Sequence, residues 1–394
     1  MAIDAVTLTV CGVSGLTLAL HAWTLRRWAR GWKQAVAASA PTKEPIQADF
    51  GVVVPCRNEE DSLPHLLDDL VVALATHPAL SHVRVVVVDD WSEDQTASLA
   101  RNHTLNPQVV SMQDRTSAPD QGGKKAALLA GIDALNTTWA GTLDADVRLN
   151  SEWGEAWLHS VASQAERCAA VAGPVRLWDG RDHGVFSQVL ALDYAAQMGW
   201  SAAQIVHGRP ASASGANLAV RRNAYPDTRH LGPSGDDALV LQTLSNNGWR
   251  VKWLGDPHAT VSTAAPKDWR QSAQQQLRWA GKARHYLPHV KRTALWVAWT
   301  SICPWIWLGY GLFANSEWNA LMSAGFWLGL TATNVAFVAP VAGWFNLPRR
   351  PTLWLGLACM QPLQAPLLAL ARLGLLRPLG VAPKPTWKGR TCTP

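Results

Sequence analysis

Trp139-Ala-Gly-Thr-Leu-Asp-Ala-Asp-Val147 is the stretch on which the fold and the chemistry of this chain depend. It predicts a short apolar strand that ends in two carboxylates, Asp144 and Asp146. On an extended backbone, residues two apart point to the same side, so both carboxylates would reach one point beyond the strand. Ligands of open α/β sheets bind at that end of the strands. Two hard oxygen ligands there suit Mg²⁺ or Mn²⁺ carrying a diphosphate, although most Asp-x-Asp pairs are solvated loop residues.

The residues around this stretch predict strands that alternate with helices from 50 to about 260. Apolar runs indicate strands at 50–54, 83–88, 109–112 and 139–143, with Pro55 ending the first. Helices are expected at 59–76 and 124–136. Such alternation predicts an α/β fold, in which a mostly parallel sheet carries helices on both faces.

The composition indicates a membrane protein. The 394-residue chain is 48% hydrophobic and only 16% charged, against about 25% charged residues in an ordinary soluble domain. Its 22 Trp residues suit the membrane–water interface. The net charge of +6 suits an anionic substrate or an anionic lipid surface. The six cysteines are scattered without a metal-binding spacing, so we expect reduced thiols that face the cytosol.

The N-terminal segment is predicted to cross the membrane. Residues 5–25 carry no charged side chain except His21, and a helix of that length spans a bilayer core. A basic cluster follows at once, formed by Arg26, Arg27, Arg30 and Lys33. The positive-inside rule therefore places the next domain in the cytoplasm. A cleaved signal peptide is the weaker alternative, because here the basic cluster follows the apolar run.

The C-terminal part is predicted to return to the membrane after a basic amphipathic helix at 267–291. Apolar runs at 294–314 and 319–345 are each long enough to span. Residues 352–376 contain prolines, so they form a kinked span or a re-entrant or interfacial segment. The predicted organisation is a transmembrane helix at 1–33, a linker at 34–48, a catalytic domain at 49–265, an interface helix at 266–292, a transmembrane region at 293–376 and a basic tail at 377–394.

Polar motifs follow the predicted strands. Arg57 and Glu59 come after the first strand, where they can hold a nucleotide or belong to a turn that caps the next helix. Asp90 comes after the second strand and can accept from a base or a ribose hydroxyl, while its neighbours cap a helix. Lys124 follows two glycines at a predicted helix start, which makes an anion site or simply a loop.

Two later motifs have both a functional and a structural interpretation. Asp236 and Asp237 precede a helix and either complement its dipole or place Asp237 in a pocket as a general base. Gln275, Arg278 and Trp279 share one helix face. They can clamp a diphosphate and support a sugar or lipid, or they belong to an interfacial helix on phospholipid headgroups.

In order and spacing, these motifs resemble the family 2 glycosyltransferases of GT-A fold, over about residues 50–290. The matching pieces are Val-Pro-Cys-Arg-Asn-Glu, Val-Asp-Asp-Trp-Ser-Glu-Asp-Gln-Thr, Gly-Lys-Lys-Ala-Ala, Asp-Ala-Asp, Ser-Gly-Ala-Asn-Leu-Ala-Val-Arg-Arg, Gly-Asp-Asp and Gln-Gln-Leu-Arg-Trp. The tail motif Trp387-Lys-Gly-Arg390 is similar to the C-terminal motif of membrane-bound members. The pattern also resembles bacterial lipid and carotenoid glycosyltransferases and ceramide-glucosyltransferase-like enzymes.

The resemblance implies roles for the donor-side residues. Asp90, with Arg57 and Glu59 nearby, would hold the uridine, and Lys124 would approach the nucleotide. Arg57 stands where Tyr is common in the family, so base stacking at this position stays open.

The resemblance also implies roles at the reacting atoms. Asp146 would bind the metal, Mg²⁺ or Mn²⁺, with Asp144 beside it and beside the ribose or donor sugar. Asp237 would deprotonate the acceptor hydroxyl, and Asp236 is the alternative base because Gly-Asp-Asp replaces the usual Glu-Asp. The leaving diphosphate and the acceptor end would be held by Gln275, Arg278 and Trp279.

The expected function is a multi-pass enzyme of the inner (cytoplasmic) membrane with a cytosolic catalytic domain. It would move one sugar, with inversion, from a nucleotide-diphosphate sugar such as a UDP-hexose to a lipid or another membrane-embedded acceptor. No nucleic-acid partner is expected. A processive polysaccharide synthase is the first alternative, and it is less favoured because three or four spans are few for a polymer channel. A non-catalytic membrane protein that uses the fold as a binding module is the second.

Overall fold

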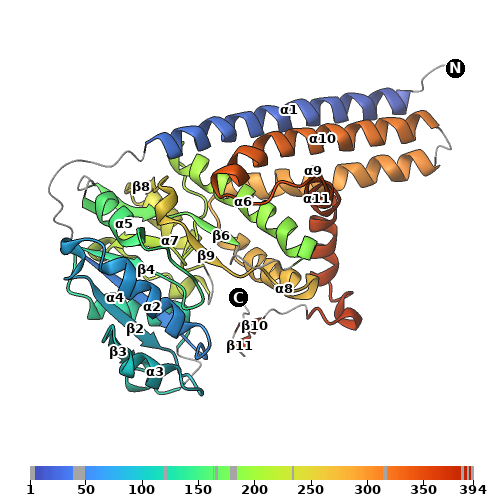
Figure 1. Ribbon diagram of the computed structural model, residues 1–394. Coiled ribbons are helices and arrows are strands. Elements are labelled where there is room, and N and C mark those ends of the chain that lie inside the picture. The colour runs from blue at the N-terminus through green and yellow to red at the C-terminus, as the bar shows by residue number, and fades with distance from the viewer. Residues whose placement is uncertain are drawn as a thin grey trace.

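The computed structural model describes residues 5–38, 49–118, 122–162, 164, 167–177, 184–232, 235–313, 317–382, 386–387 and 390–391. An α/β domain built on a central sheet is joined to a bundle of long helices (Figure 1). One helix from the middle of the chain lies between the two parts and packs against both.

The main sheet has seven strands within the described residues. In spatial order they are β3 (Gln108–Ser111), β2 (Arg84–Asp89), β1 (Phe50–Cys56), β4 (Trp139–Thr142), β7 (Leu218–Arg221), β5 (Cys168–Ala172) and β8 (Arg250–Trp253). β7 runs antiparallel to both of its neighbours, whereas the other strand pairs are parallel. The predicted α/β class with a mostly parallel sheet is therefore confirmed.

The predicted end of the first strand at Pro55 is wrong, because β1 continues to Cys56 beside β2. The Val53 carbonyl accepts from Leu143 N, so Val53 and, two residues later, Pro55 turn their backbone groups toward β4. β4 has already ended at Thr142 when the chain reaches Pro55. The missing N–H of the proline therefore leaves no ladder bond unmade.

Helices cover both faces of this sheet. On one face α4 (Lys124–Ala134) packs on Val53, Val86 and Val88. The Gly131 position allows this approach, since a Cβ there would lie 2.3 Å from a Val53 methyl. The opposite face belongs to the larger core, which includes α2 (Leu63–Leu74) and α5 (Trp153–Ala162). Two further helices of the domain are α3 (Thr96–Asn102) and α7 (Ala238–Asn246).

The element between domain and bundle is α6 (Gly184–Val206), which the sequence analysis did not predict. It is buried over most of its length. It packs against α1 (Ala5–Ala37), α10 (Glu317–Trp344) and α11 (Pro351–Arg372) of the bundle, and against β6 and β8 of the domain. β6 (Val175–Leu177) forms a small parallel sheet with β9 (Val261–Thr263).

Three described helices are long and apolar enough to cross a membrane: Leu8–Ala37 in α1, Leu321–Trp344 in α10 and Pro351–Arg372 in α11. Residues 352–376, for which the sequence left several paths open, thus lie mostly in one helix, α11, which continues through Pro362 and Pro366. α9 (Pro288–Phe313) lies beside α10 and α11 but is not among the three, and its four tryptophans lower its hydropathy.

The single amphipathic helix predicted at 267–291 is wrong. α8 spans Trp269–Ala280, a 3₁₀ turn follows at Ala283–His285, and α9 begins at Pro288. Gly281 and the proline end one helix and start the next, because glycine weakens a helix and proline favours its first turn. Near the C-terminus, β10 (Thr386–Trp387) pairs antiparallel with β11 (Arg390–Thr391), so the described residues of the tail motif lie in two short paired strands.

Candidate active site

A cavity of about 680 Å³ lies beyond the carboxyl end of β4, between the α/β domain and α6 and α8. The start of α4, the residue Asp144 after β4 and the segment before α7 supply charged groups, α8 supplies Arg278 with Gln275 and Trp279, and α6 supplies aromatic, polar and apolar side chains. The predicted site residues among its lining are Lys124, Asp144, Asp236, Asp237, Gln275, Arg278 and Trp279. Motifs separated by up to 155 positions along the chain therefore meet in one place.

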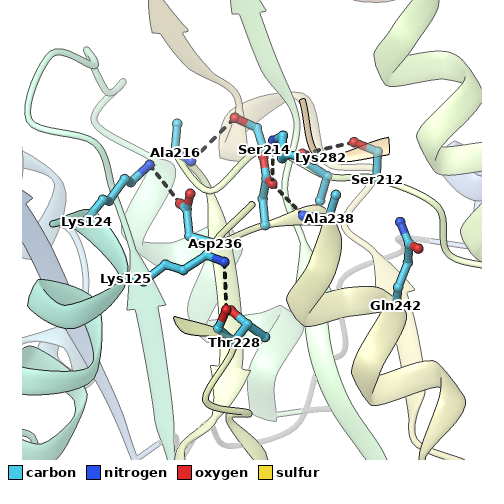
Figure 2. Close-up of polar contacts among 12 residues, drawn as sticks. Lys124, Lys125, Ser212, Ser214, Ala216, Thr228, Asp236, Ala238, Gln242 and Lys282 are labelled. Atoms are coloured by element: carbon cyan, nitrogen blue, oxygen red, sulfur yellow. Dashed lines mark hydrogen bonds and ion pairs between the residues drawn. The ribbon is translucent and has the colours of Figure 1, made fainter. Parts of the chain in front are cut away.

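A three-residue ion cluster forms the floor of this cavity. Lys124 Nζ lies 2.6 Å from Asp144 Oδ1 and 2.9 Å from Asp236 Oδ2. The Lys124 and Asp236 side chains are only 19% and 11% exposed, and Figure 2 shows the contact between them. One ammonium group thus balances two carboxylates, of which Asp236 is nearly buried and Asp144 is 33% exposed.

The cluster shifts the pKa values of its members in different directions. Burial raises the pKa of Asp144, and the charge of Lys124 offsets this only in part. Burial would also raise the pKa of Asp236, but Lys124 and then Lys282 outweigh it and lower that pKa. Burial opposes the charge of Lys124, yet the two carboxylates hold its pKa well above the ordinary value. Lys124 and Asp236 are therefore charged at neutral pH.

Asp237 is held separately from this cluster. It caps α7 by accepting from Ala238 N at 2.5 Å, and its carboxylate lies 3.4 Å from Lys282 Nζ. Burial would lower the pKa of Lys282, but Asp237 raises it above the usual value. Asp237 thus faces the cavity with one oxygen positioned by the helix start and by a lysine.

The Ser-Gly-Ala-Asn motif forms the wall beside the cluster. Thr142 at the end of β4 donates through Oγ1 to the Gly215 carbonyl at 2.8 Å. A Cβ on Gly215 would lie 2.5 Å from Asp236 Oδ2 and 3.4 Å from Lys124 Nζ. Only glycine lets the backbone approach the ion cluster this closely.

Gln275, Arg278 and Trp279 lie on α8 and line the same cavity. The Trp279 ring lies 6.3 Å from the ring of Tyr194 on α6, so an aromatic pair closes this side. Burial raises the pKa of Tyr194 to about 12, which keeps its hydroxyl neutral.

The residues predicted to hold the nucleotide, Arg57, Glu59 and Asp90, do not line the cavity. Gly123 N donates to both carboxylate oxygens of Asp90, at 3.1 and 3.0 Å, and Arg57 Nη1 donates to the Asp90 carbonyl at 3.1 Å. Gly123 itself lines the cavity, so Asp90 is one contact away from it. Glu59 borders a separate hollow of acidic residues.

The expected geometry of Asp144 and Asp146 needs a correction. β4 ends at Thr142 and residues 145–146 form a turn, so the alternation of side chains along a strand does not apply. Asp146 is exposed and lies outside the cavity lining, although its charge acts on Asp144 and helps raise the pKa of that carboxyl. The turn at residues 145–146, and not the alternation of an extended strand, therefore brings the two carboxylates near each other.

The donor set at this edge fits a hard divalent cation. Asp144 and Asp146 offer carboxylate oxygens, which Mg²⁺ and Mn²⁺ prefer. Among the described residues there is no cluster of three or more His, Cys, Asp or Glu able to hold a metal. Mg²⁺ is commonly held by one or two carboxylates together with phosphate oxygens and water, so two protein ligands are enough when a diphosphate is present.

Sequence reasoning missed Lys282, which lines the cavity, and Lys125, which lies near it outside the lining. Lys282 comes four residues after Arg278, a spacing that placed it near the same helix face. Lys125 is buried and donates to the Thr228 carbonyl at 2.8 Å, and burial lowers its pKa to about 8. Figure 2 shows Lys125 joined to Thr228 below the Lys124–Asp236 pair. The Gly-Gly-Lys-Lys signal was present, but only its first lysine was assigned.

The cavity therefore lies at the carboxyl end of a sheet strand, where α/β folds bind ligands, and three cationic and three carboxylate side chains line it. Residues 47–282, more than half of the chain, match the family described as glycosyltransferase like family 2. The chain belongs to this family, which confirms the predicted resemblance and, with the mostly parallel sheet, the GT-A class of α/β fold.

Curated relatives are similar over shorter stretches. Dodecaprenyl-phosphate galacturonate synthase from Rhizobium johnstonii is 30% identical over 112 residues, which are 27% of this chain and 31% of the relative. Polyprenol monophosphomannose synthase from Mycolicibacterium smegmatis is 36% identical over 102 residues, 26% of this chain and 35% of the relative. The chain thus matches about a third of the length of these proteins.

A solved structure is also similar at the level of the chain trace. It is a mannosyltransferase from Pyrobaculum calidifontis in complex with GDP-Man and Mn²⁺, with 18% sequence identity and a TM-score of 0.49. The match covers 90% of this chain and 97% of that one.

Proposed function

We propose that this protein is a membrane-bound inverting glycosyltransferase that moves one sugar from a nucleotide-diphosphate sugar, a UDP-hexose, to a membrane lipid. The observation that carries the proposal is the single cavity in which Lys124, Asp144, Asp237 and Arg278 meet. Family membership supports the reaction class. The names of the polyprenyl-phosphate relatives support a lipid acceptor.

Asp237 is the proposed base. A hydroxyl acceptor needs a base in line with it, and catalysis of this kind contributes about 10²–10⁴-fold. Asp236 is bound to Lys124 and has a lowered pKa, which makes it a poor base. In the single displacement, the acceptor oxygen bonds to the anomeric carbon, the bond to the diphosphate breaks, and Asp237 takes the hydroxyl proton.

The leaving diphosphate would meet the cationic side of the cavity. Arg278 can donate two parallel hydrogen bonds to phosphate oxygens, and Lys124 and Lys282 lie in the same lining. Preorganised positive charge stabilises the negative charge that grows on the leaving group. Arg57 and Asp90, one contact away, would hold the nucleoside part.

Asp144 and Asp146 would hold Mg²⁺ or Mn²⁺, which supplies further charge neutralisation on the diphosphate when bound. We expect chelation of divalent ions to lower sugar transfer by at least about 100-fold, with recovery on adding Mg²⁺ or Mn²⁺. Asp146→Asn should raise the metal concentration needed for half-maximal transfer. Full transfer in the presence of excess chelator would exclude this assignment.

The far side of the cavity favours a lipid. Met198 and Trp200 from α6, Ala211, and Val290 from the start of α9 line it, and these helices lead into the bundle. An apolar acceptor tail can therefore approach from the membrane while its polar end meets Asp237. A processive synthase, the remaining enzymatic alternative, predicts products longer than one sugar per acceptor.

The proposed location is the inner (cytoplasmic) membrane, with several spans and a cytosolic domain. Support comes from three apolar helices and from the basic residues that follow the apolar part of α1.

The direct test is transfer by the full-length protein in lipid nanodiscs, given labelled UDP-sugars and a bacterial lipid extract. We expect a lipid heavier by one hexose or N-acetylhexosamine in mass spectrometry. Asp237→Asn should reduce its rate by about 10²–10⁴-fold. Asp227→Asn is the matched control, because this carboxylate pairs with Arg229 outside the cavity lining. Unchanged transfer by Asp237→Asn would refute the assigned base, and no modified lipid would refute the function.

A further inference from the structure

A second hollow lies outside the candidate active site, where α1, the end of α6 and the start of α9 meet. Its volume is about 290 Å³. Three arginines and three tryptophans dominate its lining: Arg27, Arg209, Arg292, Trp23, Trp28 and Trp296. The proposed transfer reaction does not use this hollow.

The arginines of this hollow are available to a ligand. All three side chains are exposed, and none forms an ion pair with another described residue. Three guanidinium groups from three separate segments of the chain around one small hollow repel each other, which an anion between them would relieve. Guanidinium groups bind phosphate oxygens through paired, parallel hydrogen bonds.

Two buried polar atoms of α9 also lack a partner there. Trp296 Nε1 and His289 Nε2 are buried without a hydrogen bond among the described residues. The indole of Trp28, in contrast, donates to the Gln204 amide oxygen at 3.0 Å when that amide is oriented to accept. An indole N–H can only donate, so Trp296 needs an acceptor. A bound anion would supply one, and it would also favour the protonated imidazole of His289, in which both nitrogens donate.

The hollow lies where basic chain gives way to apolar chain in two helices at once. α1 is apolar up to Leu25 and basic from Arg26 onward. α9 is basic at Lys291 and Arg292 and apolar from residue 294 onward. Such transitions, with tryptophans beside them, mark the level of lipid headgroups. The exposed Trp23 and Leu20 continue the surface of α1 toward the apolar side.

We propose that this hollow binds the phosphate group of a membrane lipid. Arg27, Arg209 and Arg292 would contact the phosphate oxygens, the Trp296 N–H would donate to one of them, and Trp23 would lie along the lipid body. Two lipids share this chemistry: an anionic phospholipid, which carries a phosphodiester, and a polyprenyl phosphate, which carries a phosphomonoester. The site is distinct from the candidate active site, although Gln204 and His289 are close in sequence to the cavity residues Ser201 and Val290.

The test measures lipid binding to the full-length protein in detergent by native mass spectrometry. The probes are phosphatidylglycerol, undecaprenyl phosphate and, as a zwitterionic control, phosphatidylcholine. We expect the double variant Arg209→Gln/Arg292→Gln to bind the first two, or one of them, at least about tenfold more weakly. The matched control is Arg26→Gln/Arg30→Gln, which removes the same charge from exposed residues outside the hollow. An unchanged melting temperature shows that each variant is folded.

The outcomes separate the two lipid sources. A loss confined to undecaprenyl phosphate assigns the hollow to a polyprenyl lipid, and a loss confined to phosphatidylglycerol assigns it to a bulk phospholipid. A third variant, Arg209→Lys/Arg292→Lys, should retain part of the affinity, because lysine keeps the charge but not the paired geometry. Equal binding by the glutamine variant and the matched control, or an equal loss of phosphatidylcholine, would overturn the proposal. No sugar donor is present, so this result is independent of the proposed transfer reaction.

Discussion

At the scale of single residues, Lys124 decides the electrostatics of the candidate active site. Its ammonium group contacts Asp144 and Asp236 at 2.6 and 2.9 Å, and both carboxylates are largely buried. Removing one member of such a cluster leaves charges that water cannot solvate well. The two aspartates would then favour their neutral forms.

We expect Lys124→Met to lower stability by about 1–3 kcal/mol at neutral pH. Without the lysine, the pKa values of both carboxyls in the folded protein rise above their values in the unfolded chain. The variant is therefore less stable than wild type at pH values above about 4, the pKa of an unfolded aspartate, and it regains stability as the pH falls toward that value. The gap in melting temperature between variant and wild type should therefore narrow on acidification. Lys267→Met, on an exposed lysine, is the control. A difference in melting temperature that stays constant with pH would contradict this role of Lys124.

At the scale of elements, α1 depends on a close approach to α6. A Cβ at Gly31 would lie 2.8 Å from the Ala203 Cβ and 2.9 Å from its Cα, so any larger residue must push the two helices apart. Gly15 lies on the same helix with nothing within 4 Å of its would-be Cβ. The same substitution at the two glycines therefore separates the effect of helix packing on stability from the effect of helix propensity.

Gly31→Val should lower stability by about 1–3 kcal/mol because it overpacks this contact. Gly15→Val makes the same chemical change in open space and should leave stability nearly unchanged. Thermal unfolding in detergent, followed by tryptophan fluorescence, measures both variants. Equal melting temperatures for the two variants would show that α1 and α6 do not pack this closely.

Sequence reasoning succeeded for elements with a periodic or continuous apolar signal. The strands at 50–54 and 83–88 and the helix at 124–136 appear as β1, β2 and α4 within a few residues. It failed for α6, whose residues are apolar on most sides, so the helix has no polar face to reveal its period. Such a helix is buried by elements far apart in sequence, namely α1 and α10, and local pattern cannot identify those.

The sequence predicted which residues belong to the candidate site better than it predicted how they are arranged. The motifs at Lys124, Asp144, Asp237 and Arg278 do meet in one cavity. The turn at residues 145–146 was not foreseen, because tertiary contacts hold the chain there, and the break after Ala280 was missed although Gly281 and Pro288 signal it. The Arg148 backbone, for example, bonds to Ser262 in both directions, and this holds the chain after the turn.

At the scale of the whole molecule, the family-matching segment is incomplete as a folding unit. Residues 47–282 include α6, which is covered by α1 and α10 from outside the segment. Gly199 shows how tight this cover is, since a Cβ there would lie 2.8 Å from Val341. Cutting the bundle away would expose a long apolar face of α6.

The segment 47–282, expressed alone, is therefore expected to aggregate or to require detergent, whereas the full chain in detergent should elute as a discrete species. Size-exclusion chromatography and cooperative thermal unfolding distinguish these cases. A monomeric segment that unfolds cooperatively in plain buffer would show that α6 is stable without its cover.

The position of α6 has a mechanical consequence. The same helix supplies Tyr194, Met198 and Trp200 to the cavity wall and packs against α1, α10 and α11, which are long and apolar enough to cross a bilayer. Helices in a bilayer adjust to shorter or longer acyl chains by a change of tilt, among other responses. A change in bilayer thickness would thus change the shape of the cavity. The lipid composition of the membrane would then alter the rate of the enzyme without changing the residues that react.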